Sequence, residues 1–208
     1  RTGGQYLLPH LHVLWIDSSE DEVGRPAYED SDGTGIGNKL EARLVAQIVE
    51  DIVDACERDK RGKSIAVATF YNRQKRLIRR ALQEKLGRRF MDLQIDVETV
   101  DRFQGKEADI VIVSMVRNRS RRLGSNSNPA KFERINVAFS RARDLLVVVG
   151  ARKTFERFDV AIEPVDGGPP RRTCVYGQII EDIKNIGGLW QAKDILGTGT
   201  HRSADRRA

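Results

Sequence analysis

The apolar residues of this chain fall into short, uninterrupted runs separated by longer amphipathic stretches. Short Val, Ile and Leu runs are typical of strands that are covered on both faces. Strands are expected at 11–16, 64–70, 92–100, 110–113 and 145–149. Apolar residues at helical spacing predict helices at 38–56, 75–86, 152–158, 175–186 and around 132–141. Because the two kinds of element alternate, we expect an α/β fold, a doubly wound, mostly parallel sheet flanked by helices.

Segments rich in polar residues, glycine and proline divide this pattern. The acidic, glycine-containing stretch 18–37 predicts a long loop, and the Pro- and Gly-rich stretch 163–170 breaks regular structure. We expect one domain over 1–160, an extension with one helix over 161–190, and a disordered, Gly- and Arg-rich tail over 191–208. The residues of the extension expected to face inward are Val175, Ile179, Ile183 and Ile186.

The composition limits the class of protein. The chain has 208 residues and a formal net charge of +6 at pH 7, which allows one domain with a substantial core and suits a polyanionic partner. No apolar run approaches the roughly 20 residues of a membrane-spanning helix, and none resembles a secretory signal. Cys56 and Cys174 are too few for a zinc site or a disulfide framework. We expect a cytoplasmic protein without a metal site and, because residue 1 is not Met, a fragment or processed product.

Residues 97–150 carry two polar signatures, each joined to an expected strand. In the first, Gln104, Gly105 and Glu107 stand between two strands. Ligands of open α/β sheets collect at the ends of strands, so these residues are expected to line a site. A glycine that lets the backbone approach an anion, together with an amide and a carboxylate, suits a polyphosphate.

The second signature carries arginines. Arg134, Ala138 and Arg141 are spaced i, i+4 and i+7, which places both guanidiniums on one face of the expected helix. Arg143 follows at the helix end. The planar guanidinium donates several hydrogen bonds and therefore suits a phosphoryl group. The alternative is that these arginines form an ordinary solvated helix face.

Taken together, TVDRFQGKEADIVIVS and RINVAFSRAR resemble motifs V and VI of superfamily 1 helicases, especially the branch that contains the nonsense-mediated-decay RNA helicase. The resemblance implies the second RecA-like domain of a two-domain, ATP-dependent motor. It makes Arg141 the arginine finger and Arg143 a charge that couples nucleotide to nucleic acid. The residues that it places near the γ-phosphate and the attacking water are Gln104, Gly105 and Glu107.

Upstream segments extend the resemblance. NKLEA is similar to a family segment whose arginine contacts the terminal phosphate, and Lys39 stands at that position, two residues before Glu41. The segment SIAVATF and the polar residues after it resemble motif IV, which places Tyr71 and Gln74 on the base side of the nucleotide. Two alternatives stay open. Asn38 and Glu41 suit a capping box, and Tyr71 suits simple packing.

Three further residues are expected to contact nucleic acid. Thr99 matches the family residue that touches the nucleic-acid backbone. Arg117 and Arg119 belong to a run of four arginines within 117–122, which predicts a flexible basic arm that grips phosphates without choosing a sequence. The alternative for this arm is plain solvation. The expected partner is a single strand of DNA or RNA.

The chain lacks the first half of such a motor. A P-loop needs G-x-x-x-x-G-K-[ST] after a strand, but Gly62-Lys63-Ser64 has Glu57 at the position of the first glycine and precedes a strand. The resemblance therefore implies that ATP and Mg²⁺ bind between this domain and an upstream P-loop domain of the same protein. The chain alone is expected to be inactive and monomeric. Two other functions stay open: a non-catalytic nucleic-acid clamp and a protein-interaction domain.

Overall fold

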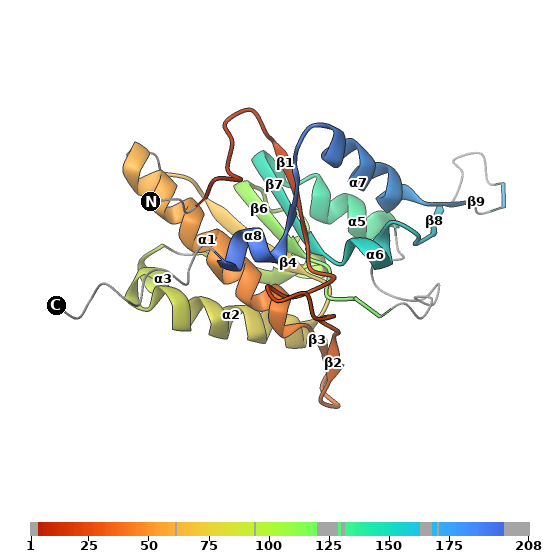
Figure 1. The fold of residues 1–208 in the computed structure, drawn as a ribbon, viewed down its shortest axis with the longest axis horizontal. Coiled ribbons are helices and arrows are strands. Elements are labelled where there is room, and N and C mark those ends of the chain that lie inside the picture. The colour runs from red at the N-terminus through yellow and green to blue at the C-terminus, as the bar shows by residue number, and fades with distance from the viewer. Residues whose placement is uncertain are drawn as a thin grey trace.

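A six-stranded parallel sheet forms the centre of the molecule (Figure 1). The computed structural model describes residues 4–197 apart from 61, 94, 120–128, 130–131, 163–167 and 170. The strand order is β10-β1-β7-β6-β4-β5, and neighbouring strands pair in parallel throughout. The strands are β1 (Val13–Asp17), β4 (Ile65–Thr69), β5 (Asp96–Thr99), β6 (Ala108–Ser114), β7 (Ala142–Gly150) and β10 (Leu189–Gln191).

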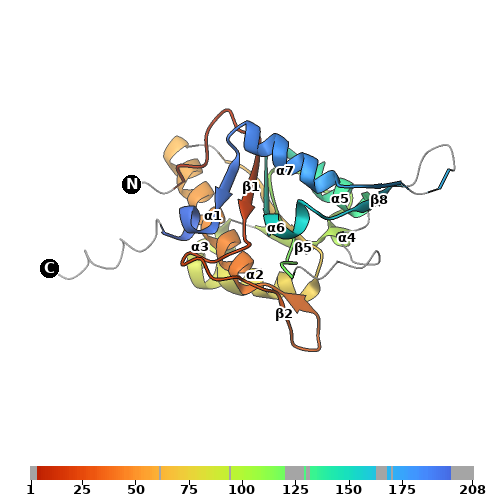
Figure 2. The same ribbon diagram turned by 45° about the vertical axis from the view of Figure 1, so that its right-hand side comes forward.

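Helices cover both faces of this sheet, which confirms the doubly wound α/β fold. On one face lie α1 (Lys39–Asp59), α2 (Asn72–Leu86), α3 (Arg88–Asp92) and α8 (Ala192–Leu196) (Figure 1). On the other lie α4 (Val100–Phe103), α5 (Phe132–Phe139), α6 (Arg152–Phe155) and α7 (Val175–Asn185) (Figure 2). Among the described residues, no helix is both long and apolar enough to cross a membrane.

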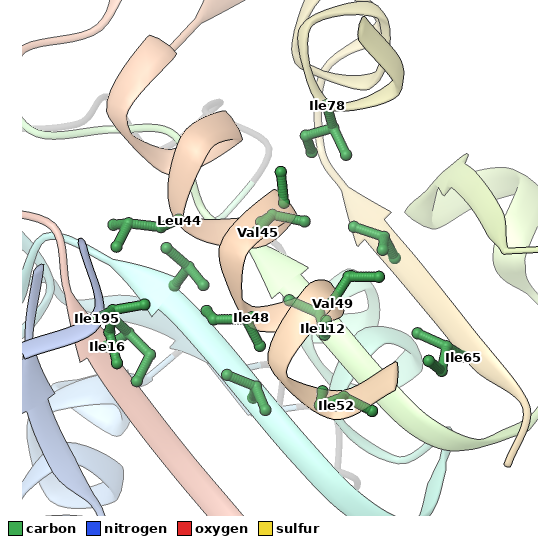
Figure 3. Packing of buried hydrophobic residues seen from close by; sticks show 14 of the residues in the cluster. Ile16, Leu44, Val45, Ile48, Val49, Ile52, Ile65, Ile78, Ile112 and Ile195 are labelled. Atoms are coloured by element: carbon green, nitrogen blue, oxygen red, sulfur yellow. The ribbon is translucent and has the colours of Figure 1, made fainter. Parts of the chain in front are cut away.

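Each face has its own apolar core. On the α1 face, one side of the helix packs Leu44, Ile48 and Ile52 between Ile16 of β1 and Ile112 of β6 (Figure 3). These five side chains are almost fully buried. On the other face, the rings of Phe139, Phe155 and Phe158 pack around Tyr176. Trp15, which contacts Phe155, and Phe103 belong to the same core. Burial of this much apolar surface is the main source of stability in a domain of this size.

Two antiparallel ribbons lie outside the main sheet. Strands β2 (Asp30–Ser31) and β3 (Ile36–Gly37) form a hairpin inside the stretch that the sequence predicted to be a plain loop. Strands β8 (Val160–Ile162) and β9 (Arg171–Thr173) form a second ribbon that extends away from the body (Figure 2).

Residues 191–197 contain the end of β10 and helix α8, which corrects the expected disordered tail for these residues, whereas 198–208 lie outside the described residues. Strand β10 pairs with β1 in the register Trp15↔Leu189 to Asp17↔Gln191, and α8 follows it. Ile195 of α8 is fully buried against the α1 core, as Figure 3 shows. In α7, Ile183 faces inward as expected, whereas Ile186 is 52% exposed because the helix ends at Asn185.

We expect Ile195→Ala to lower the free energy of unfolding by about 2–5 kcal/mol, because it removes a buried aliphatic side chain and leaves a cavity. Urea unfolding checks this value, with Lys193→Ala on the exposed side of α8 as the matched control. Equal stability of the two variants would mean that α8 does not contribute to the core.

Candidate functional site

The residues that the sequence singled out lie at two opposite edges of the sheet. Parallel strands share one carboxyl edge, where β6 ends at Ser114, and one amino edge, where β6 begins at Ala108. These two residues are about 20 Å apart at 3.3 Å per residue. The carboxyl edge carries Lys39, Glu41, Tyr71, Gln74, Thr99, Arg117 and Arg119. The amino edge carries Gln104, Gly105, Glu107, Arg141 and Arg143.

The loop of the first signature lies at the amino edge, although ligands of such sheets usually collect at the carboxyl edge. The short helix α4 starts beside the carboxyl end of β5 and returns the chain to the start of β6. Gly105 adopts a φ of +81°, a conformation that favours glycine. Lys106 Nζ lies 2.6 Å from Asp96 Oδ2 at the start of β5. Gln104 and Glu107 are exposed beside a cavity of about 460 Å³ that Phe103, Lys106 and Glu107 help to line.

Arg141 does not share a helix face with Arg134, which corrects the expectation from their spacing. Helix α5 ends at Phe139, and Arg141 occupies the turn before β7. Arg134 Nη2 lies 3.1 Å from Asp101 Oδ1 near the other end of the helix. The Arg141 carbonyl accepts a hydrogen bond from Ala108 N at 3.1 Å, which joins this turn to the start of β6.

The Arg141 side chain has the properties of a ligand-binding group. It is half-buried, its Nε is fully buried without a hydrogen-bond partner, and none of the carboxylates in the described ranges pairs with it. Buried polar groups normally have partners. Arg117 Nε and Arg152 Nε are also buried without a hydrogen bond, but those two guanidiniums each lie near a carboxylate, Glu29 and Asp17. Arg143 likewise lies 3.3 Å from Glu107 Oε2 and 3.7 Å from Asp109 Oδ1. Arg141 therefore fits an anion such as a phosphate.

Glu41 is committed inside the protein. Its carboxylate is fully buried and accepts hydrogen bonds from Ser114 Oγ (2.6 Å), Val116 N (2.8 Å) and Ser18 Oγ (3.0 Å). Burial raises the pKa of Glu41 to about 7, against the lowering effect of these three donors, and the nearby Glu29 raises it further. The side chain cannot hold a nucleotide at the same time, so its expected role as a ligand is corrected to one of positioning.

Gln74 is also internal and takes the place expected for Glu41 in the capping box. Asn38 caps α1 through its side chain, as predicted, by accepting a hydrogen bond from Glu41 N at 3.2 Å. The Asn38 backbone N donates to Gln74 Oε1 (2.8 Å) instead of to the Glu41 side chain. Gln74 Nε2 donates to Asn38 O and Ser114 Oγ. Because this fully buried amide is saturated, it does not face a nucleotide base.

Three other carboxyl-edge residues differ in their accessibility. Lys39 is 74% exposed at the start of α1, and its Nζ lies 3.9 Å from Asp30 Oδ2. Tyr71 is half-buried against the second core, and this burial raises the pKa of its hydroxyl to about 12. Thr99 ends β5 and is largely buried. None of the three shares an edge with Arg141, so the structure does not bring them into one nucleotide site with it.

The start of the expected basic arm is held in place, which corrects its predicted flexibility for residues 117–119. Asn118 is buried and donates to the carbonyls of Ser18, Ser19 and Ala27. Arg117 Nη1 lies 3.4 Å from Glu29 Oε1, and Arg119 Nη2 donates to Glu29 O at 3.4 Å. Residues 120–122 of the arm lie outside the described residues.

Val116 links this segment to α1. It has a φ of +74°, which a β-branched residue rarely adopts. Its backbone N donates to Glu41 Oε2, and its carbonyl accepts from Asn38 Nδ2 at 3.3 Å. The roles of Val116, Asn118 and Glu29 could not be predicted from local patterns, because their partners lie far away along the chain.

Nothing in the described ranges resembles a metal site, since no group of three His, Cys, Asp or Glu side chains could hold an ion. The arginines described above are the side chains whose chemistry suits an anion.

Comparison with known proteins identifies one family. The AAA domain family matches residues 4–153. The chain is 34% identical over 132 residues to the DNA replication ATP-dependent helicase/nuclease JHS1 of Arabidopsis thaliana, an alignment that covers 63% of this chain and 9% of that protein. It is 33% identical over 136 residues to the helicase sen1 of Schizosaccharomyces pombe, covering 65% and 8%.

A third similar protein is the DNA-binding protein SMUBP-2 of Rattus norvegicus, which is 36% identical over 137 residues, covering 66% of this chain and 13% of that protein. The chain thus spans about a tenth of the length of these relatives.

Proposed function

The chain belongs to the AAA domain family of superfamily 1 helicases, and we propose that it is the second motor domain of an ATP-dependent helicase or translocase. In this proposal an upstream P-loop domain of the same protein holds ATP and Mg²⁺. The chain supplies an arginine finger to the triphosphate and part of the track for a single strand. The observation that carries the proposal is the orphaned Nε of Arg141 beside the loop of Gln104, Gly105 and Glu107.

The amino edge is the proposed nucleotide side. Arg141 would place its guanidinium against the γ-phosphate, where it neutralises charge that builds up as the phosphoryl group is transferred. Gly105 lets the backbone approach an anion, and Gln104 is free to orient the attacking water. Arg143 is held by Glu107, so it supports the site by keeping this carboxylate in position. MgATP supplies the phosphoryl group and the metal charge that stabilises its transfer.

The carboxyl edge is the proposed nucleic-acid side. Arg119 is exposed there, Arg117 follows the end of β6, and Thr99 ends β5, which is separated from β6 by β4. Strand β6 runs from the Arg141 turn to the Arg117 segment. A movement at the nucleotide can therefore be transmitted to the bound nucleic acid through one rigid element. The separate edges for ATP and for nucleic acid support a motor that couples two ligands, rather than one pocket that binds a single ligand.

The chain itself is expected to bind a single-stranded oligonucleotide with an affinity that falls as salt rises, because phosphate contacts release counterions. Arg119→Ala should weaken binding equally for every sequence and reduce the slope of log K against log salt by about 0.7. Fluorescence anisotropy over a salt series measures both quantities. Arg58→Ala, an exposed arginine at the end of α1 on the opposite edge, is the matched control.

Binding that does not depend on salt would contradict the proposed track. Identical slopes for Arg119→Ala and Arg58→Ala would remove Arg119 from it.

A further inference from the structure

An exposed tyrosine stands at the carboxyl edge of the sheet without a role in the fold. Among the described residues, Tyr28 is the aromatic side chain that solvent reaches most, with 58% of its surface exposed. It belongs to neither apolar core. A large aromatic surface left in water costs free energy that burial would recover, so a partner that covers this ring would gain binding free energy from it.

The backbone on both sides of Tyr28 is fixed. The Ala27 carbonyl accepts hydrogen bonds from Asn118 Nδ2 (2.8 Å) and Asn38 Nδ2 (3.1 Å). The buried Glu29 accepts from Asn118 N through Oε2 at 2.9 Å. Residues 27 and 29 therefore anchor the segment to the interior, and the residue between them is presented outward. A ring held in this way loses little conformational entropy when it binds a flat partner.

Cationic side chains contact the segment that carries this ring. Arg119 reaches the same segment through the Glu29 carbonyl, and Lys39 reaches it through Asp30, the second residue after Tyr28. Arg25 is exposed three residues before the tyrosine. Aromatic rings combined with cationic side chains are how proteins bind single strands, since bases stack on the rings and phosphates pair with the cations.

We propose that Tyr28 is a stacking surface for a nucleobase, with Arg119 against a neighbouring phosphate. The inference rests on the proposed function and adds to it the residue that contacts bases. We favour a base of the bound single strand as the partner of the ring, because Arg141 and the proposed triphosphate lie at the opposite edge of the sheet. The base of ATP has the same chemistry and is the second source to test.

The first test compares two fluorescent strands of equal length, an oligothymidylate and an abasic strand, in anisotropy titrations with the chain. Tyr28→Ala should bind the oligothymidylate roughly 5- to 100-fold more weakly, as expected for the loss of one stacked base, and bind the abasic strand as the unaltered chain does. Tyr28→Phe should bind both strands normally. Val23→Ala, another exposed apolar side chain of the same segment, is the matched control.

The second test uses the parent protein, by which we mean the longer protein that carries the proposed upstream P-loop domain. It measures the KM for ATP at a saturating concentration of the single strand. An unchanged KM in Tyr28→Ala, together with weaker oligothymidylate binding, assigns the ring to the strand. A raised KM with normal strand binding assigns it to the base of ATP, and the stacking role still stands. If Tyr28→Ala changes neither quantity, or weakens abasic and oligothymidylate binding equally, the proposal is overturned.

The two proposals fail in different ways. If the unaltered chain binds neither strand, the nucleic-acid track and this inference both fall. If the unaltered chain binds strands in a salt-dependent manner and Tyr28→Ala matches it in both assays, only the inference falls. Thermal unfolding of each variant shows whether it is folded, and the normal abasic binding expected of Tyr28→Ala reports an intact surface.

Discussion

In the parent protein, Arg141→Ala is expected to lower the turnover number for strand-stimulated ATP hydrolysis by roughly 10³- to 10⁵-fold, the range found for arginine fingers. The physical reason is that the guanidinium meets charge that develops only as the phosphoryl group leaves. Its loss therefore raises the barrier more than it weakens ground-state binding. ATP should still bind, and equilibrium binding of a fluorescent ATP analogue checks this.

Two variants make the Arg141 prediction specific. Arg141→Lys keeps the charge but not the planar fork of donors, so most of the loss should persist. Arg157→Ala removes an arginine that is 85% exposed after α6, beyond the carboxyl end of β7, and should hydrolyse ATP normally. Normal turnover in Arg141→Ala would remove this residue from the reaction.

The second large effect concerns stability as a function of pH. Glu41 has a folded-state pKa of about 7, against 4.5 for an unperturbed glutamate. Between these values the folded state holds a proton that the unfolded state releases, so the contribution of Glu41 to stability falls as pH rises through this window. Above pH 7 the carboxylate is ionised in both states, and the contribution is constant.

Converting the shift in pKa gives a loss of about 3 kcal/mol across this window as an order of magnitude. The measurement is the free energy of unfolding in urea at pH 4.5, 5.5 and 7 for the unaltered chain and for Glu41→Gln, which cannot ionise. The stability of the unaltered chain relative to Glu41→Gln should fall as pH rises. The control is Glu84→Gln, which removes an exposed carboxylate paired with Arg80 and keeps Glu41. The stability of the unaltered chain relative to Glu84→Gln should not change with pH. Parallel pH profiles for all three proteins would contradict the buried proton.

Glu41 also matters for the proposed track. Its carboxylate accepts the backbone N–H of Val116, which precedes Arg117 and Asn118. The buried Glu41 thus helps to hold Val116, just after β6, in its unusual backbone conformation, next to Arg117.

The elements that the sequence predicted well are those with a strong local pattern. β6 and β7 are uninterrupted apolar runs, and α1 has a capping residue and a long apolar stripe, so each was found with errors only at its ends. β10 was missed because it has three residues and depends on pairing with β1. Such a strand has no signal of its own.

The two-edge arrangement of the site could not be derived from residue spacing. Motif-like residues 99–107 span both edges, since α4 is only four residues long and the chain returns to the start of β6. The internal roles of Glu41 and Gln74 depend on Ser114, which is 73 and 40 residues away from them. Local patterns identified these residues as special, but only tertiary contacts distinguish a ligand from a buried support.

The most direct test of the central claim is strand-stimulated ATP hydrolysis measured for the chain alone and for the parent protein. We expect hydrolysis by the parent and none by the chain, because in the proposed function the chain supplies the arginine and no P-loop. Hydrolysis by the isolated chain would contradict the proposed function by requiring a complete nucleotide site within it. A parent protein that binds strands without hydrolysing ATP would contradict it as well, and would leave the chain as a nucleic-acid clamp.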